Sequence, residues 1–152
     1  MSSNPFEMFE TDEKLEQDGI IVDYGAFRIR IAHAGGSNKK FSKLLNARLK
    51  PYERQLAAGT MDDDVAAKIL REVYADTIIL DADVLDKKKK ADAEDTYTQG
   101  IIIDRKGTVA PFSKENVVKL FTALPKLFTD LKKQAEDFAL FRVIEQEESA
   151  KK

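Results

Sequence analysis

A long amphipathic stretch, which runs from Pro111 to Arg142, places the strongest constraint on what this chain can fold into. Its apolar residues recur at steps that alternate between three and four, as they do along one face of an α-helix. The members of this stripe are Val117, Phe121, Leu124, Phe128, Leu131, Ala135 and Phe138, and Leu120, Leu127 and Phe141 widen it. No other segment has so long an apolar face, so we expect the remaining elements to pack on it.

A proline divides this stretch. Pro125 lacks an amide hydrogen, and an internal proline costs a helix about 3 kcal/mol unless a new helix starts there. We therefore expect two helical pieces, from Ser113 to about Leu124 and from Pro125 to about Ile144, with Ser113 as the N-cap. Most of the stripe should close the core. Its far end, at Phe138 and Phe141, is a candidate for contact with a partner protein.

Two earlier helices are expected, over residues 39–57 and 61–79, because apolar residues recur there at helical spacing. Ser37 follows two glycines and is the expected cap of the first helix, and Pro51 should kink it. The acidic run at residues 62–64 suits the first turn of the second helix, where the helix dipole favours negative charge.

Strand periodicity is clearest near residue 30. Phe27, Ile29 and Ile31 alternate with arginines, and a shorter apolar run at residues 20–22 precedes them. Residues 23–26 can form the turn of a β-hairpin. The predicted fold class is therefore mainly α, of α+β type, with a compact bundle of about four helices and a small N-terminal β-hairpin.

The 152 residues have the length of one ordinary domain. We expect a flexible N-terminal arm at residues 1–18, a single globular domain at residues 19–146 and a polar C-terminal tail at residues 147–152. The lysine-rich segment 82–100 is predicted to be a charged insert within the domain, as a solvated loop or an exposed helical extension.

The arm contains Phe6, Met8 and Phe9 within an otherwise acidic segment. Two interpretations remain open. These side chains either tuck onto the domain or form an exposed patch that binds a partner protein.

Composition argues against several classes of function. The formal net charge of −2 gives no electrostatic reason to expect nucleic acid or a membrane as a partner. The run Lys87–Lys90 is surrounded by acidic residues that cancel most of its field. There is no cysteine, and His33 is the only histidine, which we expect to lie on the surface or to be hydrogen-bonded. We therefore expect no enzyme, no catalytic residues, no metal and no cofactor.

Three segments resemble the tail assembly chaperones of long-tailed bacteriophages. They are NPFEMFETDEKLEQDGIIVDYGAFRIRIAHAGGSNKKFSKLL at residues 4–45, GTMDDDVAAKILREVYADTIIL at residues 59–80, and GTVAPFSKENVVKLFTALPKLFTDLKKQAEDFALFR at residues 107–142. The chain departs from the family at residues 81–103, where many members carry a short link that contains Trp-Gly and this chain carries the lysine-rich insert.

The resemblance implies a non-enzymatic protein of the host cell cytoplasm that is absent from the mature virion. It would bind the tape measure protein, keep it soluble and help to recruit tail tube subunits, the latter through a longer frameshifted form. The terminal pair Lys151-Lys152 motivates the hypothesis that this chain is the shorter product. We expect client contacts at Phe6, Phe9, Phe138 and Phe141.

Two points remain open beside this hypothesis. The alternative function is a structural tail or connector component that is retained in the virion. The hairpin edge and the spare apolar surface also favour self-association.

Overall fold

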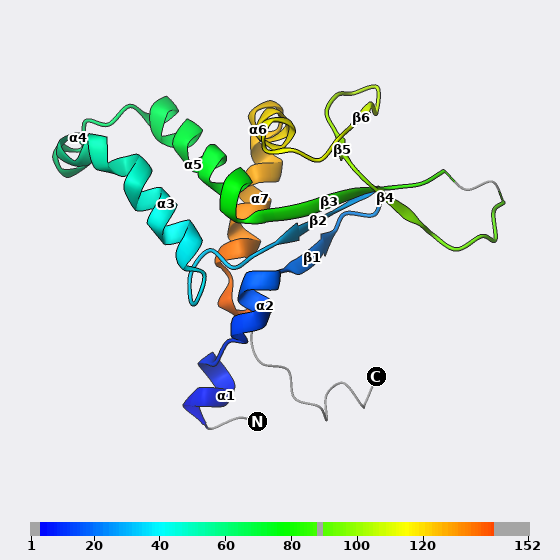
Figure 1. Cartoon of the computed structure of the whole chain (residues 1–152), viewed down its shortest axis with the longest axis horizontal. Helices are drawn as coiled ribbons and strands as arrows, with labels where there is room; N and C mark the ends of the chain where they lie inside the picture. The colour runs from blue at the N-terminus through cyan, green and yellow to red at the C-terminus, as the bar shows by residue number, and fades with distance from the viewer. Residues whose placement is uncertain (1–3, 88–89, 142–152) are drawn as a thin grey trace.

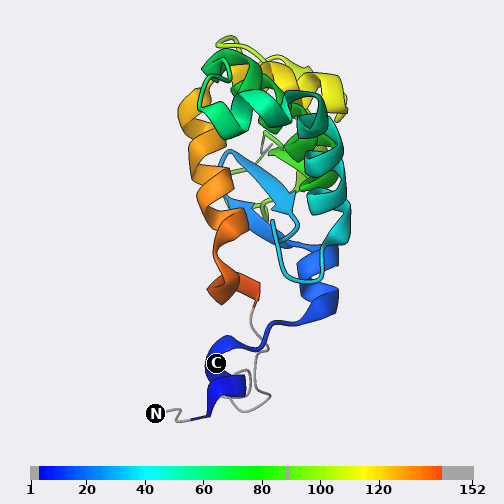
Figure 2. The same cartoon turned by 90° about the vertical axis from the view of Figure 1, so that its left-hand side faces the viewer.

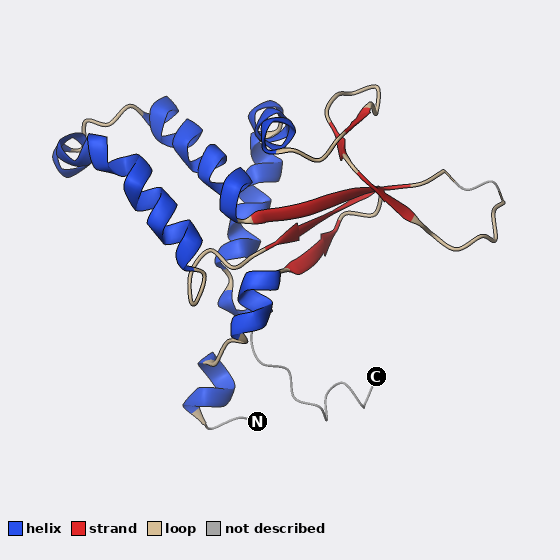
Figure 3. Ribbon diagram, viewed as in Figure 1, coloured by secondary structure: helices blue, strands red, loops and turns tan. Residues whose placement is uncertain are grey.

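The chain folds into helices and two antiparallel sheets (Figures 1 and 3). The computed structural model describes residues 4–87 and 90–141. The elements, in chain order, are α1 (Pro5–Phe9), α2 (Glu13–Asp18), β1 (Ile20–Asp23), β2 (Phe27–Ile31), α3 (Lys39–Leu49), the 3-10 turn η1 (Lys50–Tyr52), α4 (Glu53–Ala58), α5 (Asp63–Thr77), β3 (Ile79–Leu85), β4 (Tyr97–Gln99), β5 (Ile101–Ile102), β6 (Val109–Ala110), α6 (Lys114–Ala123), α7 (Pro125–Glu136) and the 3-10 turn η2 (Phe138–Phe141).

The predicted hairpin is confirmed, but it is only half of the larger sheet. β1 pairs with β2 in the register Val22↔Ile29, and β2 then pairs with β3 in the register Ile29↔Ala82. β4 adds to the far side of β3, so the order is β1-β2-β3-β4, and β5 and β6 form a separate two-stranded sheet. The fold is therefore α+β, and its strands are not confined to a small N-terminal hairpin.

The prediction for residues 82–100 was wrong at both ends of the segment. Residues 79–85 and 97–99 were expected in a helix end, a loop or a helical extension, and they form β3 and β4 instead. The aspartates of β3 face away from the core, opposite Arg28 and Arg30 of β2, while Ala82 between them is buried. Considered alone, the acidic sequence of β3 has the composition of a solvated loop. It is suitable for a strand because the arginines of the neighbouring strand neutralise it.

The core lies between one face of the larger sheet and the helices α5, α6 and α7. Aromatic rings connect these helices, because the Tyr74 and Phe128 rings meet edge to face with centroids 5.2 Å apart, and Phe121 lies 4.9 Å from Phe128. Edge-to-face and offset pairs of this kind stabilise a core beyond their buried area. The four longer helices α3, α5, α6 and α7 match the number that the apolar spacing predicts.

The predicted helix breaks are confirmed at both prolines. Helix α3 gives way to η1 at Pro51, and Pro125 begins α7 directly after α6. The hydroxyl of Ser113 accepts a hydrogen bond from the Asn116 amide, as an N-cap should (3.2 Å).

Three boundary predictions need correction. The second piece of the organising stretch ends at Glu136 rather than near Ile144, a residue that lies outside the described part of the chain. Ser37 does not cap α3, because the N-cap position belongs to Asn38 and Ser37 bonds to Glu16. Residues 1–18 were expected to form one arm, yet α2 is anchored to the body by buried Glu16, so only α1 extends away from it (Figures 1 and 2).

Candidate partner-binding surfaces

Helix α1 exposes apolar side chains at one end of the molecule (Figures 1 and 2). Asn4 caps this short helix by accepting a hydrogen bond from the Phe6 amide (2.9 Å), and Pro5 occupies its first turn. None of its residues is buried, and Phe6 and Phe9 are 71% and 62% exposed. These two side chains are three positions apart and therefore share a helix face.

An open hollow of about 720 Å³ separates α1 from the loop before α3. Phe6 and Phe9 line one side of it, and Gly36, Ser37 and Lys39 line the other. An exposed apolar face beside a hollow of this size is the kind of surface that binds a partner protein.

A buried pair of side chains fixes the base of this arm. The Glu16 carboxylate on α2 accepts a hydrogen bond from Nδ1 of His33, which follows β2, at 2.5 Å, and the two residues are 1% and 6% exposed. The hydroxyls of Thr11 and Ser37 donate to the other carboxylate oxygen, at 2.9 and 3.1 Å. Burial alone would raise the pKa of the Glu16 carboxyl, but these hydrogen bonds outweigh it and hold that pKa below its ordinary value.

Backbone contacts join the same region to the end of the described chain. The Asp12 amide donates to the carbonyl of Phe141 at 2.8 Å, and the Phe141 ring packs on the imidazole of His33 with centroids 4.6 Å apart. The Ala34 amide donates to the carbonyl of Ala135 on α7. α2, the end of β2 and η2 therefore meet around one buried polar cluster.

A second candidate surface is an apolar groove between the larger sheet and α6. It has a volume of about 320 Å³, within the range of sites that hold small apolar groups. Its floor is formed by Ile29, Ala82 and Ile101, which are all buried, and Leu124 stands at its mouth with 51% of its surface exposed. Below, the groove means this cavity.

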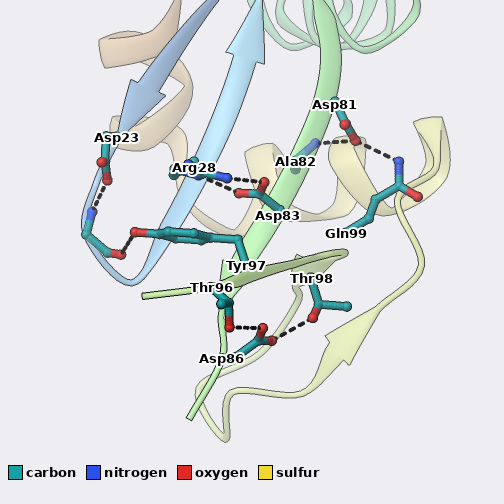
Figure 4. Close-up of polar contacts among 11 residues, drawn as sticks. Asp23, Arg28, Asp81, Ala82, Asp83, Asp86, Thr96, Tyr97, Thr98 and Gln99 are labelled. Atoms are coloured by element: carbon teal, nitrogen blue, oxygen red, sulfur yellow. Dashed lines mark hydrogen bonds and ion pairs between the residues drawn. The ribbon is translucent and has the colours of Figure 1, made fainter. Parts of the chain in front are cut away.

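The outer face of the larger sheet carries a ladder of satisfied polar groups (Figure 4). Arg28 makes two hydrogen bonds to Asp83, at 2.9 and 2.6 Å, and its guanidinium lies 3.7 Å from the centre of the Tyr97 ring. Asp83 accordingly raises the pKa of Arg28, and the hydroxyls of Thr98 and Thr96 hold the pKa of Asp86 below its ordinary value. These partners already neutralise much of the charge, so this face offers less to a charged ligand than its composition indicates.

The structure separates the four predicted contact residues. Phe6 and Phe9 are exposed, so their interpretation as partner contacts remains a prediction. The prediction that Phe141 is a surface contact is wrong, because this side chain is fully buried against His33. The side chain of Phe138 lies outside what the structure describes, and its backbone begins η2.

Two features of these surfaces were missed from the sequence. Nothing in the acidic segment 10–18 marks Glu16 as buried, and the only available signal was the presence of a lone histidine that needed a partner. His33, expected to be on the surface or hydrogen-bonded, is buried and hydrogen-bonded. The groove is formed by residues from β2, β3, β5 and α6, which no local pattern relates.

The described residues also constrain other classes of site. Among them, no helix combines the length and the apolar composition that crossing a bilayer requires. In the same part of the chain, no three histidine, aspartate or glutamate side chains converge as a set of metal ligands.

Comparison with known families gives the origin of the protein. Residues 36–152 match the family model described as YdaY prophage protein, which covers most of the chain. The chain belongs to the YdaY prophage protein family. No curated protein and no solved structure was found to match it. The YdaY match begins at Gly36, so α1, α2, β1 and β2 of this family member lie before the matched segment.

Proposed function

We propose that this YdaY family member is a non-enzymatic tail assembly chaperone, which binds the tape measure protein, keeps it soluble and helps to recruit tail tube subunits. The exposed apolar face of α1 carries the proposal. A chaperone for a long, apolar, helical client needs apolar side chains that are exposed on its surface. Phe6 and Phe9 meet this need, because they are exposed at the end of a helix that buries none of its residues.

Two further observations support the proposal. The resemblance to tail assembly chaperones extends over residues 4–45, 59–80 and 107–142, and the family assignment gives the protein a prophage origin. The chaperone acts in the cytoplasm of the host cell and is absent from the mature virion. Recruitment of the tail tube protein occurs through a longer frameshifted form.

Co-expression with the large tail gene of the same prophage tests the client. We expect the tape measure protein to co-purify with the native chain and to stay in the supernatant only in its presence. The double substitution Phe6→Ser with Phe9→Ser should abolish co-purification. Ile21→Ser is the matched control, because Ile21 is a 48% exposed apolar residue on β1, away from the arm. A tape measure protein that stays equally soluble without this chain would contradict the proposal.

A structural tail or connector component is the alternative, and one observation favours it. β1 forms an open edge of the larger sheet and exposes Ile21, and such an edge can pair with a neighbouring subunit. Mass spectrometry of purified virions distinguishes the two functions. A structural component is present at a fixed stoichiometry, whereas the chaperone is absent.

A further inference from the structure

Strand β1 leaves one side of its backbone without a neighbouring strand. It lies at the outer edge of the larger sheet, beside β2 (Figures 1 and 3). Among the described residues, no strand other than β2 pairs with it. β1 contains no lysine and no proline, and its pairing with β2 has no register shift. Charged residues, prolines and bulges are among the devices by which edge strands avoid pairing with another chain, and β1 has only Asp23 of this kind.

The pairing within the sheet shows which residues of β1 face the open edge. Along an antiparallel strand, successive residues direct their amides and carbonyls to opposite sides. The Tyr24 amide donates to the carbonyl of Phe27, at 3.0 Å, so Val22, two positions earlier, also directs its backbone groups to β2. The amides and carbonyls of Ile21 and Asp23 therefore point away from β2, toward the open edge.

Two copies of β1 can pair antiparallel through these groups in three registers. Asp23 opposite Asp23 of the second copy would place like charges together, which is unfavourable. Ile21 opposite Ile21 of the second copy would place Asp23 opposite Gly19, whose amide already donates to the carbonyl of Leu15 and whose φ is +87°. Ile21 opposite Asp23 of the second copy uses the outward groups of both residues. That pair forms twice about a two-fold axis, which gives about four backbone hydrogen bonds.

The side chains suit this third register on both faces of the sheet. Toward the core it places Val22 opposite Val22 of the second copy, and Ile20 opposite Tyr24. All three residues pack in or against the core, and Ile20 and Tyr24 are only partly buried, so pairing would remove more apolar surface from water. On the outer face, Ile21 is 48% exposed and would be covered, and the side chain directly opposite Asp23 would be apolar rather than acidic.

We propose that two copies of this chain pair through β1 in this register, so that their four-stranded sheets join into one across a two-fold axis. A second copy fits this edge because β1 complements itself in hydrogen bonding, charge and apolar surface. The contact uses the same surface on both copies and closes on itself, so association stops at the dimer. The interface is small, so the dimer is weak and depends on concentration. The proposal concerns the free protein and does not depend on the identity of the client.

Analytical ultracentrifugation of the full chain tests the dimer. We expect the average mass of the native protein to rise with concentration and to level off at twice the monomer mass. Ile21→Glu should remain monomeric, because it places an acidic side chain opposite Asp23 of the second copy. Ile21 is 48% exposed and lies outside the core cluster, so the variant should fold as the native chain does, which circular dichroism verifies.

Val109→Glu is the matched control, because Val109 is a 51% exposed apolar residue on β6, in the separate two-stranded sheet. It should dimerise as the native chain does. A native chain that stays monomeric at every concentration would overturn the proposal, as would an Ile21→Glu variant that dimerises normally. Loss of the dimer in Val109→Glu would show that the contact is not specific to β1 and would also overturn it.

Cysteine crosslinking tests the register, because the chain has no cysteine. Ile21→Cys and Asp23→Cys should form an intermolecular disulfide when they are mixed and oxidised, because the two positions lie opposite each other with Cα atoms about 5.5 Å apart. Ile21→Cys alone should not crosslink, because its copy is displaced by two residues, about 7 Å, along the strand. Efficient crosslinking of Ile21→Cys alone, or none in the mixture, would overturn this register.

Co-purification with the tape measure protein separates this proposal from the proposed function. Ile21→Glu should lose the dimer and keep the client. Phe6→Ser with Phe9→Ser should keep the dimer and lose the client, because α1 lies outside the β1 contact. Failure of one proposal therefore leaves the result for the other unchanged.

Discussion

The Glu16 carboxylate lies 2.5 Å from Nδ1 of His33, and the protein shields both side chains from solvent. Removing one partner of a buried pair leaves the other without compensation, which costs on the order of 3 kcal/mol. We therefore expect Glu16→Gln to lower the free energy of unfolding by about this amount near neutral pH. Urea unfolding measures it, and Glu13→Gln, an exposed acid on the same helix, should have little effect.

The pair of Glu16 and His33 also predicts how the free energy of unfolding depends on pH in acid. The pKa of Glu16 is lower in the folded chain than its ordinary value of 4.5, so its stabilising effect is present above that pH and is lost as the pH falls through the folded pKa. The difference between the native chain and Glu16→Gln should therefore shrink as the pH is lowered below about 4.5. A difference that stays constant down to the acid limit would show that the carboxylate charge contributes nothing.

Gly36 should tolerate no side chain. Its φ is +57°, and a Cβ at this position would overlap a carboxylate oxygen of Glu16. Gly59 has a similar φ of +69° and no atom within 4 Å of the same position, so Gly59→Ala serves as the control for backbone strain alone. We expect about 1 kcal/mol of destabilisation for Gly59→Ala and on the order of 3 kcal/mol or more for Gly36→Ala. Thermal unfolding measures both, and equal losses would contradict the clash.

Truncation of Phe141 and truncation of Phe9 should change the stability of the protein by very different amounts. Phe141 is fully buried, so Phe141→Ala should lower the free energy of unfolding by about 3–5 kcal/mol. Phe9 is 62% exposed, and Phe9→Ala should change it by no more than about 0.5 kcal/mol. Chemical denaturation of the two variants measures both changes. A small effect of Phe141→Ala would restore that residue as a surface contact.

Tyr24 should make the protein sensitive to alkali. Burial and a hydrogen bond to Asp130, 2.5 Å long, raise the pKa of Tyr24 well above its ordinary value of 10.0. Its contribution to stability is therefore complete below about pH 10 and is lost at higher pH. Denaturation across this range should show a smaller alkaline loss in Tyr24→Phe than in the native chain, with Tyr52→Phe as the control.

Local patterns predicted the features that depend on neighbouring residues in the chain. The cap at Ser113 and the breaks at Pro51 and Pro125 follow from backbone chemistry that operates over a few positions. The β1–β2 hairpin follows from the alternation of isoleucine and arginine in β2 and from the apolar run of β1 on the other side of a short turn.

The features that depend on distant residues were not predictable in the same way. β3 contains Asp81 and Asp83, which are acceptable in a strand because Arg30 and Arg28 lie opposite them, and these residues are separated by about 50 positions in the sequence. Phe141 continues an apolar stripe that was expected to reach solvent, yet α7 ends at Glu136 and the chain turns it inward. Burial of Glu16 required a histidine from another element. Each of these outcomes was decided by tertiary contact.

The order of strands in the larger sheet can be compared with the range of residues that the family model matches. The YdaY match begins at Gly36, whereas β1 and β2 end before it and β2 supplies one of the two strands that flank β3. A polypeptide that starts at Gly36 would leave that edge of β3 unpaired and would uncover the helices that Ile29 and Ile31 protect from water. The matched segment is therefore shorter than the segment that builds the sheet and its core. A polypeptide reduced to the matched segment would have to obtain the missing strand from another polypeptide, as a donated strand completes a sheet.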